Sequence, residues 1–160
     1  MREFSDIGSF VAHLAVIEAA VHMQSEHGLK KSAGLIEHAA KESLGTYQPE
    51  VGPFPAWSPL ADATKAERER LGFTPDDPLL RDGELIRDSI KHEVAGADAV
   101  IGSPEEVAAY QEFGTNKIPP RPFMGPLVIT KKKEVEAIMG KALLCALVGG
   151  NLISDNGIGE

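Results

Sequence analysis

Proline residues divide this sequence into ordered segments and the connections between them. The segment "TYQPEVGPFPAWSP", residues 46–59, holds four prolines, and "YQEFGTNKIPPRPFM", residues 110–124, holds three. Proline fixes φ near about −65° and donates no backbone N–H, so neither segment can continue a helix or occupy the centre of a sheet. Regular structure is therefore expected before, between and after these two segments.

Residues 4–44 are predicted to form a long helix. Apolar side chains recur along it at spacings of three and four residues, which places them on one face. Gly28 interrupts the pattern, so we expect the helix to bend or break there, and Gly45 is expected to end it. The apolar stripe consists of Phe10, Leu14, Ile17, Val21, Ala33, Ile36, Ala40 and Leu44.

A second helix is predicted to begin at Ser58 and Pro59 and to end before Gly72, because serine is a good N-cap and proline suits the first helical position. Residues 46–59 read as an ordered loop, since their aromatic side chains can tether them to the core. Those side chains are Tyr47, Phe54 and Trp57.

Short elements follow the connection "FTPDDPLL". A helical turn capped by Asp82-Gly83 leads into two antiparallel strands, "IKHEVAG" and "DAVIGS". A helix then begins at Ser103-Pro104 and stops at Gly114, and a last helix spans about residues 126–148. The strand side chains expected to face the core are Ile90, Val94, Val100 and Ile101.

The predicted fold class is α+β: a long N-terminal helix and a C-terminal helix packed on a small antiparallel β-sheet, with proline-rich connecting arms. We expect one domain over residues 1–148, made of a helical region (1–45) and a core (46–148). Residues 149–160 are expected to form a flexible tail, because glycine is frequent there.

Charge and cysteine content exclude some classes of protein. The formal net charge of −8 and pI near 5.1 give no reason to expect binding to a phosphate backbone. The single cysteine, Cys145, excludes an intrachain disulfide and is expected to be a small buried hydrophobe. The N-terminus does not read as a signal peptide, and no apolar run approaches the ~20 residues that span a bilayer. We therefore expect no membrane partner and a cytoplasm-like compartment.

A search for catalytic chemistry finds only weak candidates. His22, Glu26 and His27 could present ligands to a metal in a small metal-dependent or hydrolytic enzyme, but a solvated helix face explains them better. Ser89 lies near Asp88 and His92, yet one short stretch does not normally build a triad. A hydrated turn at Asp76-Asp77 and a solvated patch at Lys131-Lys132-Lys133 are likewise favoured. No catalytic, cofactor-binding or metal-binding residue is therefore predicted.

Residues 112–124 instead read as a helix stop, a turn and a stiff arm. Gly114 permits the positive φ that closes the preceding helix, and Thr115-Asn116 suits a turn. The prolines that follow hold the backbone near polyproline II geometry. Phe113 and Phe123 are expected to bracket the arm as apolar anchors. Glu112 and Arg121 could form an ion pair across the turn.

The same stretch resembles the phage tail-component and neck family. Its members carry a G-x-L-x-x-S-[IL] segment, then E-F-G-T, then a P-x-[RP]-P-F arm, and "WSPLADAT" is similar to the start of the related virion-morphogenesis (tail completion) family. The resemblance covers about residues 55–147. Asp82-Gly83 stands where Thr-Gly or Ser-Gly is more usual. The matching residues are Trp57, Pro59, Leu60, Thr64, Gly83, Leu85, Ser89, Ile90, Ala109, Tyr110, Glu112, Phe113, Gly114, Thr115, Pro120, Arg121, Pro122 and Phe123.

This resemblance implies a non-enzymatic structural protein of a phage or prophage virion. Such proteins form or cap a ring at the head–tail junction, complete the tail and join it to the capsid connector. The implied partners are copies of the chain itself and tail-tube, tail-terminator or head-connector proteins. The implied location is the virion, reached from the host cytoplasm. A further hypothesis is that Arg121 serves the seam with a neighbour more than the fold, and that the acidic chain lines a DNA conduit.

Overall fold

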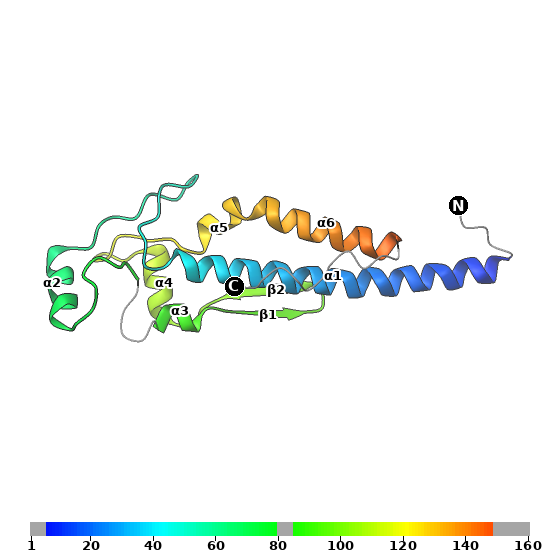
Figure 1. The fold of residues 1–160 in the computed structure, drawn as a ribbon, viewed down its shortest axis with the longest axis horizontal. Coiled ribbons are helices and arrows are strands. Elements are labelled where there is room, and N and C mark those ends of the chain that lie inside the picture. The colour runs from blue at the N-terminus through cyan, green and yellow to red at the C-terminus, as the bar shows by residue number, and fades with distance from the viewer. Residues whose placement is uncertain (1–5, 80–84, 149–160) are drawn as a thin grey trace.

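The computed structural model describes residues 6–79 and 85–148. Its central element is helix α1 (Ile7–Ser43), which lies between helix α6 (Lys132–Val148) on one side and the hairpin of β1 (Lys91–Ala95) and β2 (Asp98–Gly102) on the other, as Figure 1 shows. The predicted α+β class, with long N- and C-terminal helices and a small antiparallel sheet, is confirmed. The arrangement makes α1 the element that organises the rest.

Helix α1 begins at a capping box and continues without a break through Gly28. Asp6 accepts a hydrogen bond from the Ser9 backbone N–H at 2.8 Å, and Gly45 follows the last turn with φ of 92°. Of the two expectations for Gly28, a bend or a break, the break is wrong. The glycine serves packing, since a Cβ there would lie 3.0 Å from the Ala142 Cβ of α6. The small residue lets the two helices approach closely.

Helix α2 spans Asp62–Arg70, so its predicted start at Ser58 and Pro59 is wrong. The backbone carbonyls of those two residues accept hydrogen bonds from Arg121 instead. Tertiary contacts therefore override the local capping signal. The end of α2 agrees with the sequence, since Gly72 follows it with φ of 83°.

The β-hairpin turns at residues 96–97, where the sequence places the turn. Val94 pairs with Ala99 and His92 with Ile101, and all of these are half-buried. Val100 is 72% exposed, so its predicted core position is wrong; strand alternation turns it to the opposite face. Helix α3 (Leu85–Ser89) precedes the hairpin, and Ile90 between them is fully buried, as predicted. The predicted cap at residues 82–83 lies outside the described residues.

The C-terminal part holds helix α4 (Glu106–Phe113), helix α5 (Gly125–Thr130) and α6. The predicted helix start at Ser103-Pro104 is too early, since α4 begins at Glu106. The Ser103 hydroxyl accepts a hydrogen bond from the Glu105 N–H at 3.1 Å, just before the helix. The single helix predicted for residues 126–148 is wrong in one respect: it divides at Lys131, which lies between α5 and α6. Cys145 is buried, as expected.

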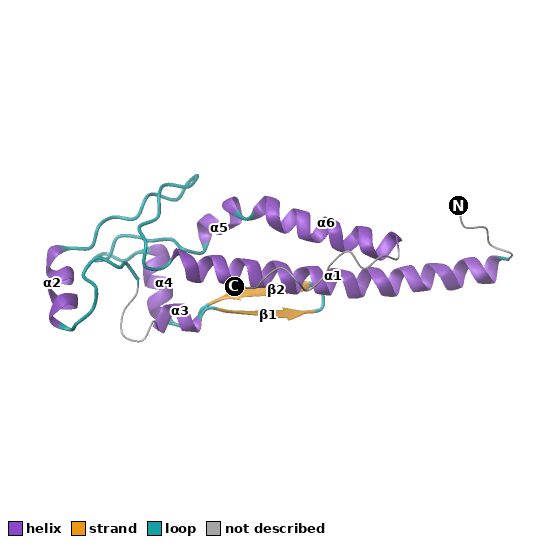
Figure 2. Cartoon of the chain, in the orientation of Figure 1, coloured by secondary structure: helices purple, strands orange, loops and turns teal. Residues whose placement is uncertain are grey.

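The main core lies at the C-terminal end of α1, where Figure 2 shows that the long loops gather. The loop 46–59 and the arm contribute the large aromatic side chains, and α1 contributes small ones. The opposite half of α1 extends beyond both α6 and the hairpin (Figure 2). The core residues are Ala39, Ala40, Leu44, Trp57, Ile86, Ile90, Ala108, Phe123 and Leu127.

Candidate assembly site: the clamped proline arm

The arm, residues 114–123, starts with a tight turn that only glycine can make. Gly114 has φ of 75°, and a Cβ there would lie 2.9 Å from the Pro120 nitrogen and 3.0 Å from the Ile118 carbonyl oxygen. Thr115 donates its backbone N–H to that Ile118 oxygen at 2.8 Å, and its hydroxyl accepts from Lys117 N–H at 3.2 Å. The predicted helix stop and turn are confirmed. Both the dihedral angle and the close approach require Gly114.

Glu112 joins the end of α4 to the start of α5. Its carboxylate accepts hydrogen bonds from the backbone N–H groups of Phe123 (2.8 Å), Met124 (3.0 Å) and Gly125 (2.8 Å). These donors have no partner within the first turn of α5, so the carboxylate caps that helix from a distance. The hypothesis of an ion pair with Arg121 is replaced by this cap. No local pattern could have revealed it, because the donors lie 11–13 residues away.

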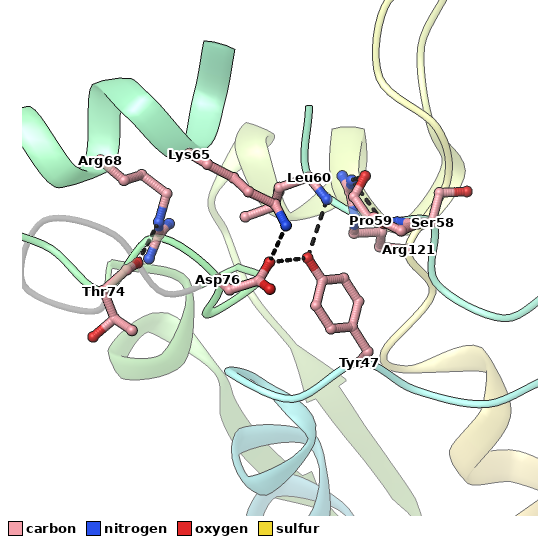
Figure 3. Close-up of polar contacts among 9 residues, drawn as sticks. All are labelled: Tyr47, Ser58, Pro59, Leu60, Lys65, Arg68, Thr74, Asp76 and Arg121. Atoms are coloured by element: carbon pink, nitrogen blue, oxygen red, sulfur yellow. Dashed lines mark hydrogen bonds and ion pairs between the residues drawn. The ribbon is translucent and has the colours of Figure 1, made fainter. Parts of the chain in front are cut away.

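Arg121 is a buried cation, with 5% of its surface exposed. Its Nε and Nη2 donate to the Ser58 carbonyl at 3.2 and 3.1 Å, and Nη2 also donates to Pro59 at 3.3 Å (Figure 3). Its backbone N–H donates to the Gln111 carbonyl at 2.7 Å. Burial lowers the pKa of the guanidinium from its ordinary value. Arg121 thus bonds the arm to loop 46–59, which favours a role in the chain's own fold.

Trp57 of the loop and Phe123 of the arm complete this attachment. The Trp57 indole N–H donates to the Pro122 carbonyl at 2.9 Å, and both Trp57 and Phe123 are almost fully buried in the core. Phe123 is therefore the apolar anchor that the sequence predicts. Phe54 lies against Gly125, where a Cβ would be 2.5 Å from the Phe54 ring. The loop and the arm are thus held together by side chains from both.

A polar network joins Asp76, in the connection after α2, to Tyr47 of loop 46–59. The Tyr47 hydroxyl donates to the Asp76 carboxylate at 2.7 Å and accepts from the Leu60 N–H at 3.0 Å, and Lys65 pairs with Asp76 at 2.8 Å (Figure 3). The hydrogen bonds from Lys65 and Tyr47 lower the pKa of Asp76, and Asp76 raises the pKa of Lys65. Asp76 is therefore used in a structural ion pair.

Phe113 does not anchor the arm. It is 81% exposed, which overturns the prediction that it brackets the arm as an apolar anchor. Tyr110 and Val107 lie three and six residues before it in α4 and are exposed too. Residues three apart lie on neighbouring positions of a helix surface, so these side chains form one apolar face. We call Val107, Tyr110 and Phe113 the α4 face; it is displayed beside the clamped arm.

The candidate metal ligands of the sequence do not converge. Residues five apart are about 140° apart around a helix, so His22 and His27 point in different directions. Glu26 pairs with Lys30 at 2.7 Å, and that hydrogen bond lowers the pKa of Glu26. Across residues 6–79 and 85–148, no group of three or more His, Cys, Asp or Glu side chains could hold a metal.

The other chemical candidates also have structural partners. Ser89 donates to the Ile86 carbonyl and shares a 2.6 Å hydrogen bond with Ser103. His92 on β1 hydrogen-bonds Glu37 on α1 at 2.5 Å. The serine and the histidine therefore serve separate contacts, and the triad reading fails on geometry. Lys131 and Lys132 pair with Glu134 and Glu136 on α6.

The long helix differs from expectation in its hydropathy. An 18-residue window of α1 has a mean hydropathy of 1.3 and none of that window is buried, so α1 is long and apolar enough to cross a membrane by length and composition alone. The expectation that no apolar run approaches a bilayer span is wrong on this measure. The exposed part of this helix is its N-terminal half, which extends past α6 and the hairpin.

The fold and the arm together define a small α+β protein whose motif residues make structural contacts. A protein of Haemophilus influenzae described as Mu-like prophage FluMu G protein 1 is 28% identical to this chain over 114 residues, which is 71% of this chain and 76% of that protein. This similarity supports a phage-related protein. No protein-family model and no solved structure matches the chain.

Proposed function

We propose that this chain is a structural component of a phage or prophage virion that completes the tail at the head–tail junction. The observation that carries the proposal is the similarity to a Mu-like prophage protein over 71% of the chain. The clamped arm is consistent with it, since Trp57, Glu112 and Arg121, which are among the residues that carry the resemblance to the tail-component and neck family, hold the arm through hydrogen bonds. We propose that the role is non-catalytic and is exercised in the virion, after synthesis in the host cytoplasm.

The geometry suits a subunit that presents fixed surfaces. A ring built by head-to-tail contacts needs two different patches on each subunit. Buried contacts of Arg121, Trp57 and Phe123 hold the arm in one shape, so little entropy is lost when a neighbour docks there. The α4 face beside the arm supplies apolar side chains for that contact. We propose that it meets tail-tube, tail-terminator or head-connector proteins.

The proposal is tested by size-exclusion chromatography with light scattering, on the chain alone and mixed with tail-tube and connector proteins of the same phage. We expect a ring or a stoichiometric complex, visible by negative-stain electron microscopy. A Phe113→Ser variant should bind these proteins more weakly without a change in its urea midpoint, while Val128→Ser, an equally exposed position on α5, should bind normally. A chain that stays monomeric with every partner would contradict the proposal.

The net charge of −8 supports a second part of the proposal, that the assembled ring lines a conduit for DNA without binding it. Negative charge repels phosphates and lets the duplex slide. A gel-shift assay with duplex DNA should show no complex at low salt. A reconstruction of the ring with a basic lumen would disprove this part alone.

A further inference from the structure

The N-terminal half of α1 is an apolar helix with large exposed side chains. It extends past the ends of α6 and the hairpin (Figure 1), and Ile7, Val11 and Val16 are each more than half exposed. Between Ile7 and Gln24, Glu18 is the one residue among Asp, Glu, Lys and Arg. An isolated helix of this length is marginal in water, and a solvated one normally carries many charges. The composition is that of a helix covered by a partner.

The apolar side chains of this segment form a regular seam. They are spaced three, four, three and four residues apart, which is the a/d pattern of helices that pack in pairs. Gly28 follows the last of them by one heptad and contacts Ala142 and Met139 of α6. The seam therefore continues, on the same side of α1, the face that α6 already covers. We call it the overhang seam: Ile7, Phe10, Leu14, Ile17 and Val21.

A second uncovered surface lies on α6. Ala142 and Cys145 are buried against α1, yet the opposite side of α6 is also apolar, and Leu144 there is 55% exposed. A helix that is apolar on all sides is normally buried on all sides. A Cβ added at Gly140 would meet nothing within 4 Å, so this side has room for a large side chain. We call it the outer row: Gly140, Leu143, Leu144, Leu147 and Val148.

We propose that the overhang seam of one copy packs on the outer row of a second copy. The two surfaces cannot meet within one chain, because the outer row points away from α1. Both are uncharged, so copies with a net charge of −8 can approach there with the least repulsion. Gly140 would receive a seam side chain as Gly28 receives Met139 within the chain. Two different patches then meet, which is the contact that closes a ring.

The same apolar helix could be read as a membrane span, and its ionisable residues argue against that reading. Glu18, His13 and His22 would have to enter the hydrocarbon, where ionisable groups are costly. A second copy covers the seam without placing these three residues in hydrocarbon.

This inference rests on the proposed function, because a ring requires such a contact. The test measures self-association of the full chain with Leu14→Glu and Leu144→Glu variants by light scattering. Each variant alone should be monomeric, with its association constant lowered about 30-fold or more. Mixed in equal amounts they should form a one-to-one complex that grows no further, because each retains one intact surface. The control Val128→Glu, exposed and outside both surfaces, should assemble like the wild type.

Three results would overturn the assignment. Assembly that survives both substitutions would overturn the proposed contact between the overhang seam and the outer row, and would leave the proposed function intact. Loss of assembly with Leu14→Glu but not with Leu144→Glu would show that overhangs pair with each other. Wild-type chain that floats with phosphatidylglycerol vesicles and stays monomeric without them would establish a membrane partner. Oligomers that form through the seam but fail to join tails would instead contradict the proposed function. Circular dichroism must show the same helix content for each variant.

Discussion

Arg121 joins two segments that lie 63 residues apart in the chain. Its guanidinium donates hydrogen bonds to the carbonyls of Ser58 and Pro59 in a buried position. An unpaired charge or an unpaired carbonyl would be costly there. Glu112 plays the matching part for backbone N–H groups at the start of α5. The sequence identifies both residues as members of one motif. It could not identify their partners, since backbone carbonyls and N–H groups leave no residue-type signal.

Arg121→Ala should lower the free energy of unfolding by about 2–4 kcal/mol, because carbonyls of the loop lose a charged donor in a buried place. Arg121→Lys should recover only part of this loss, since an ammonium lacks the planar fork of the guanidinium. Urea denaturation measures both. Lys117→Ala, at the exposed tip of the arm, is the matched control and should be neutral. A stable Arg121→Ala protein that fails only in assembly would restore the hypothesis that Arg121 serves the contact with a neighbouring subunit more than the fold.

Glu112→Ala should cost about 1–3 kcal/mol, because N–H groups at the start of α5 lose their acceptor. Glu112→Gln should cost less, since its amide oxygen still accepts. Hydrogen exchange should show faster exchange of the Phe123 and Gly125 amides in both variants. Glu136→Ala, on the exposed surface of α6, provides the control. Unchanged amide protection would show that the carboxylate does not cap α5.

At the scale of elements, hydrophobic periodicity predicts the helices and the strand pair, and tertiary contacts explain the departures. α1 is continuous because Gly28 is used for close packing, and α2 starts late because Arg121 binds the carbonyls of Ser58 and Pro59. The hydrophobicity of Val100 predicts an inward position, but strand alternation from the half-buried Ala99 and Ile101 turns its side chain outward. Local pattern determines which element forms. Packing determines its bounds and its exposed face.

The contact between α1 and α6 depends on Gly28. A Gly28→Val substitution should destabilise the chain by about 1–3 kcal/mol, because its side chain would collide with Ala142 and Met139. Gly34→Ala, on the same helix, should stabilise by up to about 1 kcal/mol, since its Cβ finds ordinary contact with His92 at 3.9 Å. Thermal denaturation compares the two. Equal effects of the two substitutions would show that α6 does not approach α1 at Gly28.

The contact between α1 and β1 should make stability depend on pH. Burial alone would raise the pKa of Glu37, but hydrogen bonds from Lys41 and His92 outweigh it and lower the pKa. A lowered carboxyl pKa contributes stability above the ordinary value of 4.5, and the contribution is lost as pH falls through the lowered value. Glu37→Gln should therefore be less stable than wild type at pH 7, and the difference should shrink below about pH 4. A difference in urea midpoint that stays constant from pH 7 to pH 3 would contradict this.

At the scale of the whole molecule, the two ends of α1 differ: one is packed in the main core and the other has no element of the described fold covering its apolar side chains. The clamped arm, loop 46–59 and the main core gather at the C-terminal end of α1, and the overhang extends from the other (Figures 1 and 2). The motif residues indicate a phage protein, which the similarity to the prophage G protein supports. The overhang seam is readable as an apolar stripe in the sequence. Its lack of a covering element is known only from the fold.

The central claim, a structural role in joining tail to head, is tested most directly by electron microscopy of particles made without this protein. The gene is deleted from the phage or prophage that carries it, and particle production is induced. We predict filled heads and separate tails that do not join, and restoration of complete particles by the wild-type gene supplied in trans. Leu14→Glu supplied in the same way should restore few or none. Complete, infectious particles in the absence of the protein would contradict the account.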